Sequence, residues 1–372
     1  MLRFFLSIIS LLVITAAFIF PGNFTCAQNS KPTKSIEASF GEKLDAEIKQ
    51  FVDKGFSGAV LVARNHKITL NKTYGNAANY GANPAFWIAS NSKSFVAAAI
   101  LKLQEQKKLS VNDPLVKFFN DVPADKQQIT IHHLLTHTSG LPHKYAADGV
   151  TEREKAVKAI LSLPLGWKVG EGYHYSNDGY NLLAAIVEIS SKRTFEDFTR
   201  KEILNRVKLD NSGLWGYENN ANLTPVANVR NTEKIGPSIY KAGKSAVNWG
   251  FRGATGIYST TEDVYKWMLA LEKNKILNQT SREQLWGKQA LMSQISPTEE
   301  HFYGYGWGVR FKNGKRIYVR HTGDEDWLGH NAVMCLYENG DAYVVLSNSG
   351  APNDEMNWSS SVSRALQKQL QP

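Results

Sequence analysis

The sequence predicts an α+β protein in which one antiparallel sheet of about five strands is built from both ends of the chain. Two short apolar runs rich in β-branched residues, 58–63 and 68–74, lie near the N-terminus. Near the C-terminus, two pairs of strand-like runs each flank an Asn-Gly dipeptide, at 313–314 and 339–340, which is a strong hairpin signal. The residues between these groups show mainly helical patterns, so we expect flanking helices and an inserted, mainly helical lobe.

The N-terminal strands are preceded by a predicted helix. From Phe40 to Val52 the apolar residues recur at helical spacing, and Gly55 ends the run. The next run, 58–63, is too short and too β-branched for a helix. Residues 64–67 have turn composition, so the following run returns as the second strand of a hairpin.

The C-terminal strands are expected on either side of each Asn-Gly turn, at 305–311 and 316–321 and then at 332–337 and 342–347. Both faces of the last pair are apolar, as expected of strands that are covered by helices on each side. Apolar residues on one face of 358–370 indicate a closing helix.

These assignments define the expected domain organisation. A signal peptide, 1–27, precedes one folded domain, 28–372. Within that domain the sheet lobe comprises 36–80 and 302–372, and the helical lobe comprises 81–301. A functional site in such a protein is expected in the cleft between the lobes, where pockets commonly form.

The first residues have the pattern of a secretory signal peptide. Arg3 gives a positive start, 4–20 is uncharged and largely apolar, and Pro21 follows it. Small residues offer a cleavage point after Ala27. An uncleaved membrane anchor is the alternative, because the apolar run is at the short limit of a membrane span. A lipoprotein site at Cys26 is disfavoured by the bulky and polar residues before it. We therefore expect an exported protein, periplasmic or extracellular.

Composition excludes several classes of protein. The chain of 372 residues is 42% hydrophobic and 21% charged, which fits a globular domain and not a disordered or collagen-like chain. Two cysteines exclude a disulfide scaffold and a cysteine-based zinc cluster. Once the signal peptide is removed, Cys335 is a lone thiol in an apolar strand, where a buried hydrophobic role is expected. The net charge of +9 comes from scattered Lys and Arg, so we expect no nucleic-acid partner.

The first chemical motif is Ser90-Asn91-Ser92-Lys93, which opens an apolar run of good helix formers. If Ser90 begins a helix, Lys93 lies one turn later on the same face, with Cβ atoms about 5–6 Å apart. A serine hydroxyl needs a base to act as a nucleophile, and an amine enclosed by apolar walls can accept its proton. Alone, the Ser-x-x-Lys pattern is typical of an exposed first turn of a helix.

The second motif is Tyr175-Ser176-Asn177, which precedes another helical run. A phenol near cations can relay protons between a nucleophile and a leaving group. The amide of Asn177 can bind a substrate carbonyl or hold Lys93. A helix-capping turn beside a buried tyrosine is the alternative interpretation.

The third motif is His321-Thr322-Gly323, at the end of a predicted strand. A strand edge here can hold an extended substrate, and a backbone N–H just beyond the glycine can complete an oxyanion hole. The alternative is an ordinary strand end with a turn glycine.

Together the three motifs, in this order and context, resemble those of the penicillin-binding serine hydrolases. This superfamily includes class C β-lactamases, D-Ala-D-Ala carboxypeptidases and related esterases and D-aminopeptidases. The segments 134–142 and 253–263 are also similar to segments of the family, and Ser259 and Glu262 have capping-box spacing at the start of a helix. The likeness spans roughly 40–369, and it implies the β-lactamase/DD-peptidase fold.

The resemblance implies an exported serine hydrolase that acts through an acyl-enzyme on an amide, lactam or ester. The roles that it assigns are catalytic for Ser90, Lys93 and Tyr175; substrate binding for Asn177, His321, Thr322 and Gly323; and oxyanion-hole donation for the backbone N–H groups of Ser90 and Asp324. No metal or organic cofactor is implied. The expected partner is a small-molecule or peptide substrate, with a fragment of the cell wall as one candidate. Contact with the membrane is expected only through an uncleaved N-terminal segment.

Two residues depart from the pattern of penicillin-recognising relatives. Many of these have Lys where His321 stands, and because histidine titrates near neutrality, carboxylate recognition is expected to be weaker or pH-dependent. Arg320 should point to the opposite face of its strand and should not substitute. The acidic triplet 324–326 is interpreted as a solvated turn; alternatively it raises the pKa of His321 or favours substrates with a free amine.

Other classes of hydrolase lack their signatures. The adjacent pair His132-His133 does not form a metal-binding motif, and neither His-Glu-x-x-His nor Gly-x-Ser-x-Gly occurs in the chain. The alternatives that remain are a carboxylesterase or D-aminopeptidase of the same family, or a catalytically silent binding or sensor module on the same fold. The motifs alone do not specify the substrate or the oligomeric state.

Overall fold

The computed structural model describes residues 36–215, 248–325, 329–350 and 357–370. The predicted signal peptide, 1–27, lies outside these residues. Within the described ranges, no helix combines the length and the apolar character needed to cross a bilayer.

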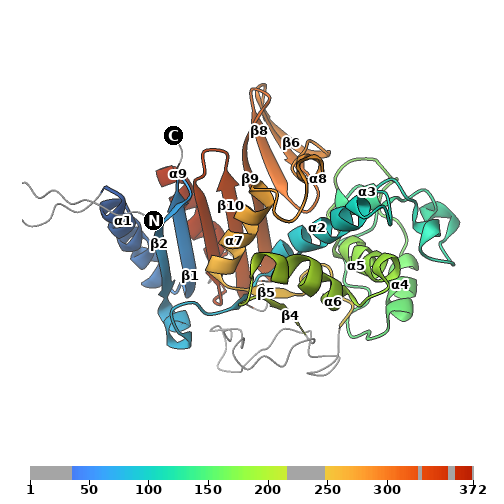
Figure 1. The fold of residues 1–372 in the computed structure, drawn as a ribbon, viewed down its shortest axis with the longest axis horizontal. Coiled ribbons are helices and arrows are strands. Elements are labelled where there is room, and N and C mark those ends of the chain that lie inside the picture. Colours follow the sequence, from blue (N-terminus) through green and yellow to red (C-terminus); the bar gives the residue numbers. More distant parts are fainter. Residues whose placement is uncertain (1–35, 216–247, 326–328, 351–356, 371–372) are drawn as a thin grey trace, which may run out of the picture.

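An antiparallel sheet forms the centre of the described structure (Figure 1). Its strands are β1 (Gly58–Arg64), β2 (Lys67–Tyr74), β6 (Ala290–Ser296), β7 (Glu299–Tyr303), β8 (Gly308–Lys312), β9 (Lys315–Glu325), β10 (His330–Tyr337) and β11 (Ala342–Ser347). Their order across the sheet is β2-β1-β11-β10-β9-β8-β7-β6. A second sheet of three short strands consists of β3 (Phe86–Trp87), β4 (Gly213–Leu214) and β5 (Ile257–Ser259).

The pairing of β1 with β11 joins the two ends of the chain, with Val60 opposite Val345. The prediction of an α+β fold with an antiparallel sheet made from both chain ends is therefore confirmed. The predicted helix, strand and hairpin positions near both termini correspond to observed elements, and the last strand, 342–347, is observed at its predicted bounds.

The predicted strand number of about five is wrong: the described sheet has eight strands. The additional β6 and β7 form a hairpin at the far edge, and the proposed lobe boundary at 301/302 falls inside β7. The side chains of β6 are mostly exposed or half-buried, so its sequence lacks the apolar alternation that predicts a strand. The strand expected from Tyr305 begins only at Gly308, because Gly306 (φ 71°) makes a turn.

Helices cover both faces of the sheet (Figure 1). They are α1 (Ile36–Val52), α2 (Ser92–Glu105), α3 (Ile131–Leu135), α4 (Arg153–Leu161), α5 (Asn177–Ser191), α6 (Phe195–Thr199), α7 (Thr261–Glu272), α8 (Gln279–Leu285) and α9 (Trp358–Leu370). Helices α1 and α9 pack on one face of the sheet, whereas α7 packs on the other, towards α2 and α5.

The alternation of side chains along the central strands explains the two cores. On β1, Val60 and Val62 belong to the cluster beneath α1 and α9, whereas Leu61 belongs to the larger cluster that contains α2 and α5. Strands that are buried on both faces read as continuous apolar runs, as the sequence shows here. Cys335 is fully buried in the α1/α9 cluster, and burial raises the pKa of its thiol to about 12.

The start of α7 differs from the predicted capping box. Thr260, not Ser259, is the N-cap, and its side chain accepts from the backbone N–H of Asp263. Ser259 is instead the last residue of β5, where its hydroxyl is 2.7 Å from that of Ser212. The N-cap is one residue later than predicted because Ser259 belongs to β5.

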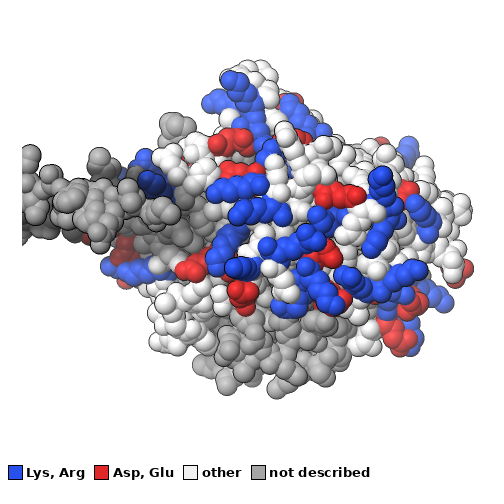
Figure 2. All heavy atoms as spheres, viewed as in Figure 1, with Lys and Arg blue, Asp and Glu red and all other residues white. Residues whose placement is uncertain are grey.

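The distribution of charged side chains on the surface matches the scattered positions of Lys and Arg in the sequence. Figure 2 shows many Lys and Arg side chains on one face of the molecule, interspersed with Asp and Glu.

Candidate active site

Ser90 lies in a short 3-10 turn, Ala89–Asn91, between β3 and α2. The helix therefore begins at Ser92, two residues later than predicted. Ala89 has φ 47°, in the left-handed region that a residue with a Cβ rarely adopts, at a cost of about 1–2 kcal/mol. This sharp turn directs Ser90 into a cleft while α2 continues into the core.

Lys93 is fully buried on the first turn of α2. Its Nζ lies 3.0 Å from Ser90 Oγ, 2.8 Å from Asn177 Oδ1 and 2.9 Å from the carbonyl oxygen of Ala254. Three acceptors satisfy all three N–H groups of an ammonium ion. A neutral amine in the same place keeps two of these bonds and turns its lone pair towards the Ser90 hydroxyl, so the geometry serves proton transfer in both directions.

The acceptor at Ala254 is held in place by Asn181 on α5. Asn181 Oδ1 accepts from the backbone N–H groups of Gly253 and Ala254, and Asn181 Nδ2 donates to the carbonyl of Gly250. The side chain is 1% exposed, so these bonds have no solvent to replace them. Asn181 thus fixes the turn, 250–254, whose Ala254 carbonyl faces Lys93.

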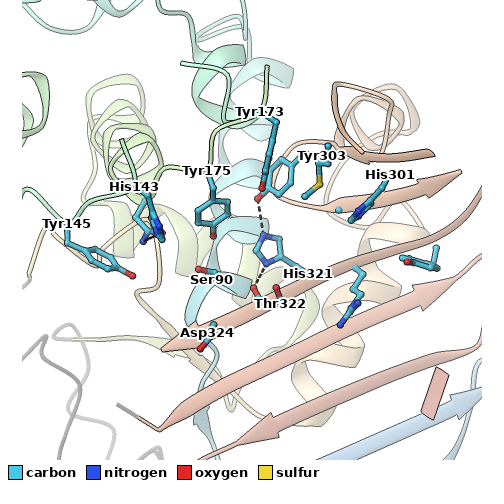
Figure 3. Close-up of a pocket in the computed structure, with 15 residues that line it drawn as sticks. Ser90, His143, Tyr145, Tyr173, Tyr175, His301, Tyr303, His321, Thr322 and Asp324 are labelled. Carbon is cyan, nitrogen blue, oxygen red and sulfur yellow. Dashed lines mark hydrogen bonds between the residues drawn. The ribbon is translucent and has the colours of Figure 1, made fainter. Parts of the chain in front are cut away.

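Tyr175 lies directly above the Lys93 amine, whose Nζ is 4.8 Å from the centre of the phenol ring. Figure 3 shows its hydroxyl pointing towards Ser90. Its position is fixed by His137, whose ring lies 4.1 Å from the Tyr175 ring and whose Nδ1 accepts from the backbone N–H of Ser176. The His137 carbonyl accepts from His174 N on the other side. Burial, with a smaller effect of Lys93, lowers the pKa of His137 well below its usual value, so this support is neutral.

Strand β9 brings the third motif against the nucleophile turn. A Cβ added at Gly323 would lie 2.4 Å from the Ile88 carbonyl oxygen, 3.0 Å from Ala89 Cβ and 3.1 Å from Ser90 N. Only glycine allows this approach. It brings the backbone beyond Gly323 alongside the N-terminus of the Ser90 turn, as an oxyanion hole requires.

His321 is buried and neutral, which differs from the expected titration near neutrality. Its Nδ1 lies 2.7 Å from the Thr322 carbonyl and its Nε2 lies 2.9 Å from the Tyr303 hydroxyl (Figure 3). The carbonyl only accepts, so Nδ1 carries the proton and Nε2 accepts from the phenol. Burial and the nearby Lys93 charge lower the pKa of His321 to about 3. Among the described residues, no carboxylate is a cause of this shift. The hypothesis that the acidic triplet raises the pKa of His321 therefore stays a prediction.

The charged residues beside this motif have separate partners. Arg320 lines part of the cleft, but its Nη2 donates to Ser363 Oγ (3.4 Å) on α9, across the sheet, as predicted. Asp324 also lines the cleft, and its Oδ2 accepts from Asn357 Nδ2 at 2.9 Å. The end of the acidic triplet, Asp326, lies outside the described residues.

The cleft has a volume of about 570 Å³, and Ser90, Tyr175 and Asn177 all open into it. Its walls are mainly aromatic, with contributions from Tyr145, Tyr173, Tyr303, Tyr318, His143 and His301. Among the described residues, no cluster of three or more His, Cys, Asp or Glu side chains is placed to bind a metal ion.

The cleft is lined by the predicted site residues Ser90, Tyr175, Asn177, His321, Thr322 and Asp324. Lys93 lies beneath Ser90, and Gly323 packs against the Ser90 turn. The sequence analysis missed His137, His143, Asn181 and Tyr303. His137 lies in the family-like segment 134–142, which is a signal that was available. Asn181 lies one helical turn after Asn177 on α5, which was also a usable signal. His143 and Tyr303 have no such spacing and are brought to the site by tertiary contacts.

Known proteins resemble this chain in sequence and in fold. The family model described as Beta-lactamase matches residues 44–360. The putative penicillin-binding protein PbpX of Bacillus subtilis is 27% identical over 291 residues, which cover 77% of this chain and 69% of that protein. A penicillin-binding protein from Bacillus halodurans superposes with a TM-score of 0.70 at 24% identity, over 88% of this chain and 100% of its own.

A further solved structure, the D-amino acid amidase from Ochrobactrum anthropi complexed with D-phenylalanine, superposes with a TM-score of 0.70 at 19% identity. It covers 89% of this chain and 99% of its own. Likeness at these identities shows a shared fold. Because the family model matches most of the sequence, the chain belongs to the Beta-lactamase family.

Proposed function

We propose that this protein is an exported serine hydrolase that forms an acyl-enzyme on Ser90. The observation that carries the proposal is the fully buried Lys93 amine, 3.0 Å from Ser90 Oγ. A buried amine whose partners are a serine hydroxyl, an amide oxygen and a carbonyl is placed for proton transfer, since a purely structural lysine gains little from such burial.

In the proposed reaction, Ser90 Oγ attacks the carbonyl carbon of an amide, lactam or ester. The hydroxyl proton passes to Lys93, and Tyr175 relays a proton to the leaving group as the bond between carbonyl carbon and leaving group breaks. The backbone N–H groups of Ser90 and Asp324 stabilise the oxyanion, and Asn177 contacts the carbonyl side of the substrate. Water then attacks the ester of Ser90, which releases the acid and restores the hydroxyl.

The substrate that fits the cleft best lacks a free carboxylate near the scissile bond. The neutral His321 supplies no cation, and the Arg320 guanidinium is engaged on the opposite face of the sheet. Asp324 at the cleft instead favours a positively charged group such as an amine. The aromatic walls favour an apolar or aromatic acyl side chain. We therefore propose an amide or ester of an amino acid with a free amine, or a small neutral ester.

Turnover of matched substrates tests this proposal. D-phenylalanine p-nitroanilide, its N-acetyl derivative, p-nitrophenyl butyrate and nitrocefin are compared, with Ser90→Ala as the control. We expect hydrolysis that depends on Ser90 and a higher kcat/KM for the free amine than for the acetylated amide. Equal values for these two would contradict the role of Asp324. Failure of every substrate and of every electrophilic label would favour a silent binding or sensor module.

A further inference from the structure

A histidine outside the three motifs contacts the buried end of the site. His143 lies on the segment between α3 and α4, and it remains accessible at the mouth of the cleft. Its Nε2 is 3.0 Å from Asn177 Nδ2, and its ring meets that of Tyr175 edge-on, with centroids 5.4 Å apart and planes at 90°. Asn177 therefore lies between His143 on one side and Lys93 on the other.

The polarity of this chain of contacts follows from the donors at its buried end. Lys93 Nζ donates to Asn177 both as an ammonium ion and as a neutral amine whose lone pair faces Ser90. The Asn177 atom 2.8 Å from it must therefore be the amide oxygen. The amide nitrogen then faces His143 and can only donate. Nε2 of His143 must accept, which requires a neutral imidazole that carries its proton on Nδ1.

We propose that His143 is a positioning residue for Asn177. Its neutral imidazole fixes the amide with the oxygen on Lys93 and one N–H on Nε2, and it leaves the second N–H for the substrate carbonyl. This inference rests on the proposed function. When His143 gains a proton, Nε2 becomes a donor that faces another donor. The amide can restore that bond only by turning over, which places its nitrogen on Lys93 and removes the acceptor there.

The charges around His143 keep it neutral near pH 7. Burial against the cleft wall lowers its pKa below the ordinary value, and the positive charges of Lys93 on α2 and Lys144 on its own segment lower it further. The other titratable groups that face it are the Tyr175 phenol and the neutral His137, and Asp324 lines the same cleft. Activity should therefore fall on the acid side, as His143 takes up its proton.

Two substitutions at His143 separate the hydrogen bond from the ring contact. His143→Phe keeps an aromatic ring against Tyr175 but has no acceptor, and we expect about a tenfold loss of kcat/KM at neutral pH. His143→Gln supplies an amide oxygen as an acceptor that does not titrate. We expect it to keep kcat/KM within about threefold of wild type at neutral pH and to lack the acid limb assigned to His143.

The control is His66→Gln, on the turn between β1 and β2, where the imidazole pairs with Glu272. It should keep the wild-type pH profile. The proposal is overturned if His143→Phe retains wild-type kcat/KM, or if His143→Gln shows the same acid limb as wild type. Covalent labelling of Ser90 by a fluorophosphonate is measured on each variant. If Ser90 is labelled but the pH profile of His143→Gln matches that of wild type, only the role of His143 is refuted. If the wild type is not labelled, the proposed function is refuted.

Discussion

Replacement of Gly323 by alanine tests how tightly β9 must approach the nucleophile turn. The new Cβ would lie 2.4 Å from the carbonyl oxygen of Ile88, and it would press on Ala89 and on the backbone nitrogen of Ser90 as well. Ordinary contact for such a pair begins at 3.4 Å, so strand and turn must separate by about 1 Å in a close-packed interior. Overpacking of this kind costs about 1–3 kcal/mol of stability.

The effect on catalysis should exceed the effect on folding. A shift of about 1 Å between the two oxyanion donors is expected to lower the rate of Ser90 acylation about 100-fold. The assay is the second-order rate of fluorophosphonate labelling, measured on protein shown to be folded by urea denaturation. Gly166→Ala is the matched control, because its added Cβ meets only the Gly140 carbonyl at 3.9 Å. A folded Gly323→Ala variant that acylates at the wild-type rate would refute the assigned packing.

Three further predictions concern buried polar groups. Asn181→Leu leaves three backbone groups without partners and should lower the free energy of unfolding by at least about 3 kcal/mol in urea; a loss below about 1 kcal/mol would contradict its role. Burial raises the pKa of the Asp178 carboxyl to about 7. Because the folded state then holds its proton more tightly than the unfolded state, stability should fall by up to about 4 kcal/mol as pH rises from about 4 to about 7. Asp178→Asn should lose this slope in urea melts at several pH values, and an unchanged slope would contradict the assignment. Cys335 should react with iodoacetamide only after unfolding, and rapid labelling of native protein would show that its strand opens.

Much of the sheet could be predicted because its central strands are apolar on both faces and are bounded by Asn-Gly turns. Val333 and Val345, which face α1 and α9, alternate with Ala332 and Val344, which face α2 and α7. The outer hairpin β6–β7 escaped prediction because its side chains are half-exposed, so it carries no period-2 signal.

That missing hairpin explains the error at His321. Tyr303, whose hydroxyl donates to His321, is the last residue of β7. Without β7 the imidazole was expected to titrate near neutrality, whereas Tyr303 on that strand contacts a buried ring. The omission of β7 from the predicted sheet thus led to a wrong prediction for the pKa of His321.

The contacts of His143 could not be predicted from the sequence for a different reason. The segment that carries it has no regular structure, and its path is fixed by tertiary bonds. The Asp178 carboxylate accepts from Ala146 N (3.2 Å), and Asn248 Nδ2 donates to Asp148 at 2.9 Å. Such bonds follow from no regular spacing in the sequence. The motif residues were recognisable because the reaction of a serine nucleophile restricts their types and order.

Mass spectrometry of a trapped intermediate examines the central claim most directly. The full-length protein is incubated with a fluorophosphonate or a slowly hydrolysed ester, quenched in acid and digested, and the modified peptide is sequenced. We expect one adduct per chain on Ser90, lost in Ser90→Ala and formed at least about 1,000-fold more slowly in Lys93→Met, which lacks the proton acceptor. Stoichiometric labelling of another side chain, or labelling of Ser90 at an undiminished rate without the amine, would contradict it.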